Sequence, residues 1–432
     1  MGRVVLGMLG LGTVGTGVVR LLAQQRHLTL KKIAVRDGTK KRDIEPPCPV
    51  TMDAGEVLDD PEIEIVVEVM GGEQPALEYM RRAIEKRKHI VTANKEVLAK
   101  HGPELFELAR KRGVAIFFEA SVAGGVPLIS TIQKGLEANE ISSVAGILNG
   151  TTNFILSSME QRGEDFGVAL KQAQQLGFAE ADPTNDVEGY DVAYKLSILS
   201  ALAYGRFAKP ESIYREGITK ISAEDIANAR EFGYRIKLVG STRCASDGQG
   251  GSGPLHVRVH PTLVPLTHPL SSVSGSHNGI LVTGHAVGEI VMVGPGAGQM
   301  PTASAIVGDI INLSSALQLP DFASYFQTAI GSEWADISPS GDWMCPYYLK
   351  LDVADSPGVI GQIGTTFGAH SISIKSILQR GTEEGGASIV ILTHAVRNDD
   401  MEKALEELRQ KKFLTKLASC IRIFEPVKEG TN

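Results

Sequence analysis

Residues 3–22 read RVVLGMLGLGTVGTGVVRLL, and this stretch decides the fold of the N-terminal part of the chain. The apolar run 3–9 is typical of a buried strand, and the apolar spacing beyond Thr13 is typical of a helix. The turn between them is Gly10-Leu11-Gly12-Thr13-Val14-Gly15. In a G-x-G-x-x-G turn so placed, the first glycine makes the turn, the second lets backbone approach a pyrophosphate, and the third packs helix on strand. The stretch predicts dinucleotide binding at the helix N-terminus; the alternative is a merely tight turn.

The same alternation of short apolar runs and helical stretches continues to about residue 130. We expect strands at Leu30–Val35, Ile63–Val69, Ile90–Thr92 and Val114–Glu119, and helices at Pro75–Lys86 and Pro103–Arg112. Strands that alternate with helices predict a Rossmann-type, doubly wound parallel sheet over residues 1–130. We expect a later helix, 301–318, to complete this domain.

The remaining chain predicts α+β architecture in two further domains. Residues 131–300 combine helical stretches with alternating apolar and polar positions over 255–293, which favours a mixed or antiparallel sheet in a second domain. The run Asp247–Gly253 predicts a solvated loop, and residues 319–345 predict a linker. Residues 346–428 follow the order strand, helix, strand, strand, helix, strand, which predicts a self-contained ferredoxin-like domain.

Composition excludes several classes of protein. The 432 residues carry 43 Lys plus Arg against 50 Asp plus Glu, a formal charge of -7, so the chain has no basic footprint for nucleic acid or an anionic membrane. No other apolar run approaches the ~18 residues of a membrane span. The four cysteines lie far apart, which argues against disulfides and zinc and favours a cytoplasmic protein.

The predicted second strand ends Ala34-Val35-Arg36-Asp37, and this sequence bears on the choice of dinucleotide. An arginine at this point can hold a 2′-phosphate, so Arg36 favours NADP(H). NAD(H) stays possible, because the adjacent Asp37 could take a ribose hydroxyl. A solvated basic turn is the structural alternative, since Lys40, Lys41 and Arg42 follow directly.

Two separated segments carry candidate catalytic groups. Lys95 ends the segment Val91–Lys95 at the carboxyl end of a predicted parallel strand, where ligands bind in such sheets. The densest polar cluster runs from Gly177 to Leu196, and a helix over Val187–Ala203 would place Glu188, Asp191 and Lys195 on one face. An exposed Asp191–Lys195 pair is the alternative. Against it, the apolar sequence after Lys195 predicts a buried helix, in which charged groups need partners.

Several motifs together resemble homoserine dehydrogenase over residues 4 to about 318. They are GLGTVG at the start, VTANK at 91–95, EASVAGGVP at 119–127, NGTTNFIL at 149–156, the 180–195 block, and GPGAGQMPTASA at 294–305. The tail, with Asp355-Ser356-Pro357-Gly358-Val359 after its first strand, resembles an ACT regulatory domain.

The resemblance implies NAD(P)-dependent interconversion of L-homoserine and L-aspartate 4-semialdehyde, on the route to threonine and methionine. It implies proton transfer by Lys195, substrate polarisation by Lys95, and support from Asp191. Substrate contacts are expected at Glu180, Asp186, Lys95, Gly150 and Thr151. Cofactor contacts are expected at Gly10, Gly12, Thr13, Val14, Gly15, Arg36, Lys95 and Gly298. A structural sodium ion is expected at Glu119, Val122, Gly124 and Val126.

The resemblance also implies that residues 131–300 form the substrate-binding and dimerisation domain. It implies a homodimer or homotetramer that is inhibited by a feedback amino acid, threonine, bound between paired C-terminal domains. Two other functions stay open. Aspartate semialdehyde dehydrogenase would need a nucleophilic cysteine, but no cysteine here lies in a Gly/Asn-rich strand-to-helix turn. A sensor would bind dinucleotide and amino acid without turnover. The histidines at 260, 268, 277 and 285 lack metal-ligand spacing, so we expect them to be structural.

Overall fold

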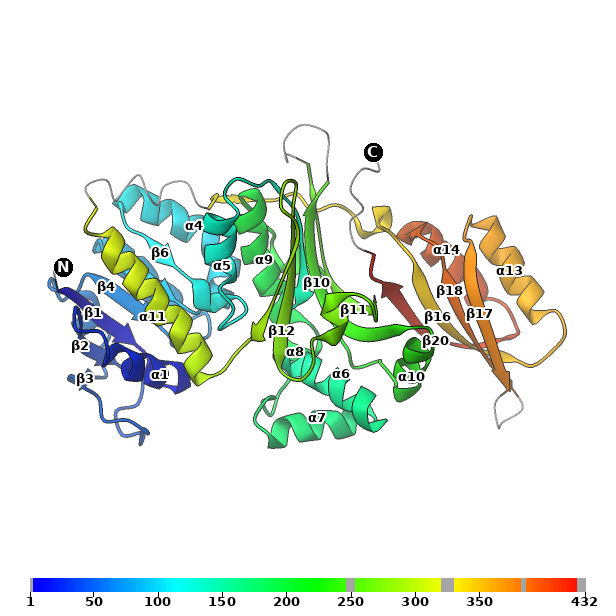
Figure 1. Cartoon of the computed structure of the whole chain (residues 1–432), viewed down its shortest axis with the longest axis horizontal. Coiled ribbons are helices and arrows are strands. Elements are labelled where there is room, and N and C mark those ends of the chain that lie inside the picture. Colours follow the sequence, from blue (N-terminus) through cyan, green and yellow to red (C-terminus); the bar gives the residue numbers. More distant parts are fainter. Residues whose placement is uncertain (1–2, 246–252, 320–329, 382–385, 426–432) are drawn as a thin grey trace.

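The computed structural model describes residues 3–245, 253–319, 330–381 and 386–425. Three parts follow one another along the long axis of the molecule (Figure 1). The predicted loop at Asp247–Gly253 lies outside the described residues, apart from Gly253 itself. None of the described helices combines the length and the apolar character needed to cross a membrane.

The N-terminal part is a parallel sheet of six strands in the order β3-β2-β1-β4-β5-β6, which confirms the predicted Rossmann-type arrangement. Its strands are β1 (Val4–Leu9), β2 (Leu28–Ala34), β3 (Val50–Thr51), β4 (Ile65–Glu68), β5 (His89–Thr92) and β6 (Ile116–Phe117). Its helices include α1 (Thr13–Leu22), α2 (Gly55–Leu58), α3 (Ala76–Glu85) and α4 (Lys95–Arg112). The order of the strands reverses at β1: β2 and β3 lie on one side of it, and β4, β5 and β6 lie on the other. This reversal opens a ligand crevice at the carboxyl ends of β1 and β4.

Helix α4 begins at Lys95, eight residues before the predicted start at Pro103. The Asn94 side chain accepts a hydrogen bond from the Val97 N–H, so this residue caps the helix. Pro103 lies within the helix, where sequence reasoning expects a start. The earlier start places Lys95 in the first helical turn, directly beside the end of β5.

Helix α11 (Gln299–Ala316) returns from the middle of the chain and packs against α1 (Figure 1). A Cβ at Gly17 would lie 2.7 Å from the Gln299 carbonyl and 2.8 Å from Ala303 Cβ, so the two helices approach as closely as glycine allows. Apolar residues of α11, among them Ile306 and Ile310, thereby join the buried core of the N-terminal part.

The middle part is an antiparallel sheet covered by helices. Its main strands are β7 (Ile141–Ile147), β10 (Tyr234–Cys244), β11 (Leu255–Pro265), β12 (His277–Gly284) and β13 (Gly288–Pro295). Its main helices are α6 (Gly150–Arg162), α7 (Phe166–Gln175), α8 (Thr184–Val187), α9 (Tyr190–Tyr204) and α10 (Ala223–Glu231). Before β7, the chain forms a short helix, α5 (Leu128–Ser130), and a π-helical turn, η2 (Thr131–Gly135).

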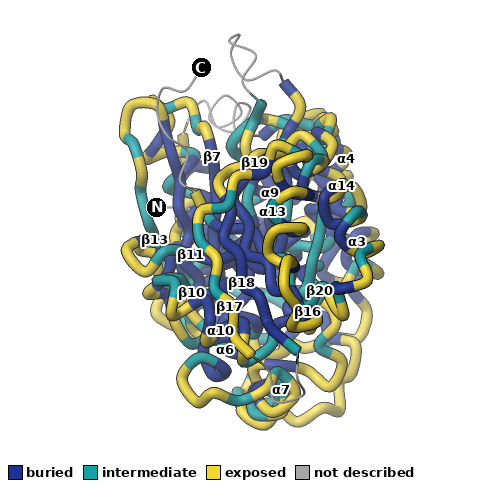
Figure 2. Tube along the Cα trace, turned by 90° about the vertical axis from the view of Figure 1, so that its right-hand side faces the viewer, coloured by how far each residue is buried: buried dark blue, intermediate teal, exposed yellow. Residues whose placement is uncertain are grey.

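The C-terminal part has the predicted order β16 (Tyr347–Ala354), α13 (Val359–Ala369), β17 (Ile374–Gly381), β18 (Gly386–Thr393), α14 (Asn398–Arg409) and β20 (Leu414–Ile423). The four strands are antiparallel in the order β20-β16-β18-β17, and both helices cover one face of the sheet (Figure 1). Strand β18 is buried, whereas the edge strand β17 is largely exposed (Figure 2).

The middle and C-terminal sheets are one continuous sheet, so the C-terminal domain is not self-contained as the sequence suggested. Strand β20 pairs in parallel with β11 through Thr262↔Arg422 and Leu263↔Ile423. Buried Arg422 completes the junction, with Nη1 2.8 Å from Glu216 Oε1 and Nη2 donating to Tyr214 and Asn398. Sequence periodicity cannot reveal this pairing, because about 160 residues separate the two strands and edge-strand pairing leaves no local signature.

Candidate active site

The candidate site is a cavity of about 470 Å³ between the N-terminal sheet and the middle domain. Residues from α1, the end of β5, α6, the α8–α9 region and the loop after β13 line it. The lining residues that the sequence predicted are Val14, Lys95, Gly124, Gly150, Thr151, Asp186, Asp191, Lys195 and Gly298. The cavity thus brings together side chains that lie more than 280 residues apart in the sequence.

The glycine turn has the spacing of a phosphate site. A Cβ at Gly10, where φ is +104°, would lie 2.8 Å from the Val69 carbonyl, and a Cβ at Gly15 would lie 2.6 Å from the Gly10 carbonyl. Both glycines are therefore required by packing within the protein. Gly12 has open space around its Cβ position, and no side chain caps the α1 N-terminus that starts at Thr13. The free N–H groups and the open space fit a pyrophosphate at this point.

After the end of β2, Asp37 and Arg42 form hydrogen bonds within the protein, whereas Arg36 forms none with the described part of the chain. The Asp37 carboxylate accepts hydrogen bonds from the Thr39 N–H and hydroxyl, at 2.8 and 2.7 Å, which lower its pKa. Arg42 donates to the backbone carbonyls of Leu11 and Asp37, so it braces this loop against the glycine turn. Arg36 is exposed and has no hydrogen-bond or ion-pair partner among the described residues. This leaves a free guanidinium, which fits an anionic group on the ribose.

A buried carboxylate lies at the centre of the cavity wall. Asp191, in the first turn of α9, pairs through Oδ1 with Lys95 and through Oδ2 with Lys195, whose Nζ is 2.8 Å away. Asp191 is fully enclosed, whereas the Lys95 side chain is 41% exposed and opens into the cavity. The two lysines come from different domains, so this carboxylate joins the two walls of the site.

Burial and charge give the two lysines different acidities. Burial lowers the pKa of Lys195, and the nearby charge of Lys95 lowers it further, although Asp191 opposes both. The charge of Asp191 raises the pKa of Lys95 in spite of burial. Burial alone would raise the pKa of Asp191, but the two ammonium groups hold it below the ordinary value. Lys95 is therefore a fixed positive charge, and Lys195 is the group suited to exchange a proton.

Helix α9 begins at Tyr190 rather than at the predicted Val187. Gly189, at φ +81°, ends the short helix α8 and redirects the chain, so Glu188 lies outside α9. The expectation that Glu188 shares a helix face with Asp191 and Lys195 is wrong for this reason. The Glu188 carboxylate instead accepts a hydrogen bond from the Thr219 hydroxyl.

Two asparagines hold the cluster in place, and the sequence reasoning missed both. Asn149 caps α6, and its Nδ2 donates to Asp191 at 2.9 Å and to Asp186 at 2.7 Å. Buried Asn278 donates to the Leu148 carbonyl, which also accepts from Lys195 Nζ at 2.6 Å. An Asn before a helix is a readable capping signal for Asn149. Asn278 has no such signal, because its partner is 130 residues away.

The other predicted substrate contacts differ in their placement. Gly150 and Thr151 line the cavity at the start of α6, where the Thr151 hydroxyl donates to the Phe178 carbonyl. The exposed Glu180 lies in the next loop, and its side chain is not among the lining groups of the cavity. Asp186 lines the cavity, and burial followed by the charge of Asp191 raises its pKa. Gly298, at φ +123°, starts the turn into α11.

The segment proposed for sodium turns sharply behind the cavity. Ala123 and Gly124 have φ values of 59° and 54°, so two successive residues are left-handed. No described residue donates a hydrogen bond to the carbonyls of Val122 and Gly124, and both residues are buried. Buried carbonyls without donors fit a hard cation. The Glu119 side chain is used elsewhere, since it accepts from the Ile129 and Ser130 N–H groups, each at 2.8 Å.

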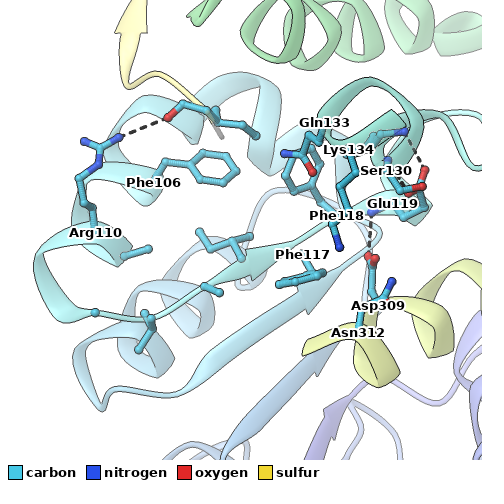
Figure 3. Close-up of a pocket in the computed structure, with 17 residues that line it drawn as sticks. Phe106, Arg110, Phe117, Phe118, Glu119, Ser130, Gln133, Lys134, Asp309 and Asn312 are labelled. Atoms are coloured by element: carbon cyan, nitrogen blue, oxygen red, sulfur yellow. Dashed lines mark hydrogen bonds between the residues drawn. The ribbon is translucent and has the colours of Figure 1, made fainter. Parts of the chain in front are cut away.

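A second cavity adjoins Glu119 (Figure 3). Phe106, Phe117 and Phe118 form its apolar wall, and Asp309 of α11 reaches its floor. Asp309 accepts a hydrogen bond of 2.8 Å from the Glu119 N–H. Burial raises the pKa of Asp309 to about 8, and the charge of Glu119 contributes. Asp309 therefore connects α11 to the segment 119–126 through this hydrogen bond. Its carboxyl group is largely protonated at neutral pH.

The cavity can support transfer of a hydride and a proton between a dinucleotide and a small polar substrate. It combines a phosphate-binding turn, a lysine of lowered pKa and a fixed ammonium charge beside it. Among the described residues, no group of three or more His, Cys, Asp or Glu side chains could hold a metal ion. The described cysteines are all free, and none lines this cavity.

Comparisons with known proteins agree with this geometry. Three family models match: the homoserine dehydrogenase NAD-binding domain at residues 10–119, homoserine dehydrogenase at 127–311, and the ACT domain at 347–413. The chain is 43% identical to homoserine dehydrogenase of Synechocystis, covering 97% of this chain and 99% of that one. It is 38% identical to the Bacillus subtilis enzyme, with coverage of 97% and 98%.

Solved structures show the same likeness. The homoserine dehydrogenase of Thiobacillus denitrificans is 40% identical, with 98% of each chain covered and a TM-score of 0.90. A hyperthermophilic archaeal homoserine dehydrogenase in complex with NADPH is 26% identical, with a TM-score of 0.61 over 74% of this chain and 99% of that one.

Asp309 makes a specific contribution to the pH dependence of stability. Because its pKa is raised from 3.8 to about 8, the folded chain keeps a proton that the unfolded chain releases as pH rises through this range. The contribution of Asp309 therefore falls as pH rises toward 8, by at most about 1.4 kcal/mol per pH unit. We expect Asp309→Asn, which keeps the shape without the titration, to gain melting temperature relative to the native chain between pH 5 and pH 8.

Glu289→Gln, at an exposed position, serves as the control, and its melting temperature relative to the native chain should not change with pH. A difference between Asp309→Asn and the native chain that does not vary with pH would contradict the assignment.

Proposed function

The chain belongs to the homoserine dehydrogenase family, and we propose that it interconverts L-homoserine and L-aspartate 4-semialdehyde by hydride transfer with lysine-assisted proton transfer. The observation that carries this mechanism is the shared Asp191 carboxylate between Lys95 and Lys195. A dinucleotide, when bound, supplies or accepts the hydride at the substrate carbon. The residues of the chain handle the proton and the charge on the substrate oxygen.

Lys195 is the proposed proton donor and acceptor. In reduction of the aldehyde, its ammonium gives a proton to the carbonyl oxygen as the carbon gains the hydride, and a neutral amine remains. In oxidation, the neutral amine takes the hydroxyl proton. Two of its three N–H bonds are directed to Asp191 and the Leu148 carbonyl, which leaves the third for the substrate. The lowered pKa of Lys195 reduces the free-energy difference between its ammonium and amine forms at neutral pH, which favours proton exchange.

Lys95 is proposed to polarise the substrate oxygen and to stabilise negative charge there. Its raised pKa keeps it charged throughout the reaction, and its side chain is open to the cavity. Asp186, Gly150 and Thr151 would surround the substrate from the middle domain. Glu180 is proposed to bind the substrate amino group, which requires its loop to move toward the cavity when substrate binds.

Replacing Lys195 tests the mechanism directly. Lys195→Met keeps the volume of the buried side chain but cannot move a proton, so we expect kcat for homoserine oxidation to fall by about 10²–10⁴-fold. NADPH binding should persist, because Lys195 lies outside the glycine turn. The measurement is the absorbance of reduced nicotinamide during turnover, with cofactor binding followed by fluorescence.

Two further variants sharpen this test. Lys171→Met changes an exposed lysine and should leave turnover unchanged. Asp191→Asn removes the charge that raises the pKa of Lys195, so the rise of oxidation with pH should move to lower pH. Full activity of Lys195→Met would exclude Lys195 as the proton carrier. Dinucleotide binding by the native chain without any turnover would favour the sensor function.

NADP(H) is the proposed cofactor, with NAD(H) as a weaker alternative. Support comes from the free Arg36 guanidinium and from the internal use of the Asp37 carboxylate by Thr39. Arg42 would add positive charge near the same ribose while it braces the loop. The NADPH complex of the archaeal relative is consistent with this choice.

Arg36 determines this preference in our proposal. Arg36→Ala should raise KM for NADP by about tenfold or more, because a charge-assisted contact to a 2′-phosphate is lost. KM for NAD should change little, since NAD lacks that phosphate. Arg26→Ala, an exposed arginine outside this loop, is the matched control. An equal effect of Arg36→Ala on both cofactors would contradict the assignment.

A structural sodium ion is proposed beside the cavity, held by backbone carbonyls at Glu119, Val122, Gly124 and Val126. The buried carbonyl oxygens of Val122 and Gly124, which accept no hydrogen bond from any described residue, support this sodium site. The ion would fix the left-handed turn that presents Ala123 and Gly124 to the cavity. Thermal melts in sodium chloride and in choline chloride at equal ionic strength would test this assignment.

We further propose that threonine inhibits the enzyme through paired ACT domains in a homodimer or homotetramer, as part of threonine and methionine synthesis. Two exposed isoleucines, Ile360 on α13 and Ile377 on β17, provide apolar surface for pairing with a second copy. The loop Asp355–Gly358 after β16 would contribute polar contacts to the ligand.

Asp355→Ala should reduce threonine inhibition by about fivefold or more while basal activity stays unchanged, because Asp355 is exposed and far from the catalytic cavity. Inhibition curves with L-threonine measure this effect, and Asp400→Ala on α14 is the control. A point substitution is preferable to removal of 346–432, because that deletion would also remove β20 from the edge of β11. Unchanged inhibition in Asp355→Ala would contradict the proposed site.

A further inference from the structure

A third cavity, which we name the β20 cleft, lies where the ACT domain meets the catalytic part of the same chain. Its volume is about 430 Å³, comparable to that of the active-site cavity. One wall is Leu417–Ile421 of β20, with Arg409 at the end of α14. The opposite wall is the loop Arg215–Ile221, with Glu188 behind it. The cleft is separate from the Asp355–Gly358 loop and from the exposed face of β17.

The charged side chains that line the β20 cleft differ in how many hydrogen-bond or ion-pair partners they have. Glu216 is used internally, since it pairs with Arg422 and Tyr214. Lys220 and Arg409, in contrast, have no hydrogen-bond or ion-pair partner among the described residues. The Glu188 carboxylate receives a single side-chain hydrogen bond, from Thr219. The lining of the cleft thus combines two exposed cations without partners among the described residues, one half-buried carboxylate with a single hydrogen bond, and apolar residues of β20 and the facing loop.

We propose that the β20 cleft binds a small free α-amino acid. The ligand carboxylate would pair with Lys220 and Arg409, and its ammonium group would pair with Glu188. Leu417, Ile221 and Pro261 provide apolar surface for a short side chain. An inorganic anion would satisfy the two cations only, whereas an amino-acid zwitterion also satisfies the carboxylate.

Direct contacts connect the cleft to the catalytic helix. The Ile218 N–H donates to the Val187 carbonyl at 2.9 Å, at the end of α8. A Cβ at Gly217 would lie 2.4 Å from that carbonyl, so the loop fits there only as glycine. The Arg215 guanidinium lies 3.9 Å from the ring centroid of Tyr190, the first residue of α9. Asp191 is the next residue, so a ligand that moves this loop acts within one residue of the catalytic carboxylate.

The effect on turnover rests on the proposed function, but the binding itself does not. Calorimetry with the full chain would use L-alanine, L-threonine, L-methionine and L-aspartate as probes, and the N-acetyl form of each of them and sulfate as comparisons. We expect at least one amino acid to bind and to change kcat/KM for homoserine by about fivefold or more. Its acetylated form and sulfate should bind at least about tenfold more weakly.

Paired variants locate the site. Lys220→Ala/Arg409→Ala should weaken Kd for the bound amino acid by about tenfold or more, and so should Glu188→Gln. Lys403→Ala/Lys416→Ala, which removes two exposed lysines outside the cleft, should leave Kd unchanged. Absence of binding by all four amino acids, unchanged Kd in both cleft variants, or equal binding of sulfate would overturn the proposal. Absence of turnover with intact binding would instead count against the proposed catalytic function.

Discussion

The structure depends most on one buried carboxylate. Asp191 is enclosed in the wall between two domains, and an unpaired charge there would be strongly unfavourable. Lys95 comes to it from the first turn of α4, Lys195 from the next turn of α9, and Asn149 from the cap of α6. Breaking a buried pair of this kind typically costs about 3–5 kcal/mol. The ion pairs at the centre of the candidate site therefore also join the two domains.

The same cluster explains how two lysines a short distance apart differ in chemistry. Both lie beside one negative charge, but only Lys195 is enclosed by protein, so desolvation dominates its pKa. Lys95 faces the cavity, and the attraction of Asp191 dominates. One of the two is thereby suited to release a proton and the other to remain charged. Asn278 and the Leu148 carbonyl hold the direction of the Lys195 amine.

The continuous sheet joins the ACT domain directly to the middle part. Because β20 adds to the edge of β11, the two parts share backbone pairing as well as side-chain contacts. Helix α10 reinforces the junction, since Asp225 accepts a hydrogen bond from Tyr348 of β16. The Arg215–Ile221 loop then connects this junction to the start of α9.

The sequence by itself determined the local structure and indicated most of the candidate site residues. The glycine turn, the alternation of strands and helices, and the strand and helix order after residue 346 are all local patterns, and the structure confirms them. The lysine at 195 and the carboxylate at 191 stand four residues apart on one helix, so their pairing could also be anticipated.

Only the tertiary structure decided which distant groups meet. Lys95, Leu148 and Asn278 surround α9 from positions far away in the chain, and β20 joins β11 across about 160 residues. Helix boundaries were also decided by contacts, as Asn94 and Gly189 show. The physical reason is that periodicity and capping report interactions within a few residues. Burial, which sets the acidity of Lys195, is created only when separate segments pack together.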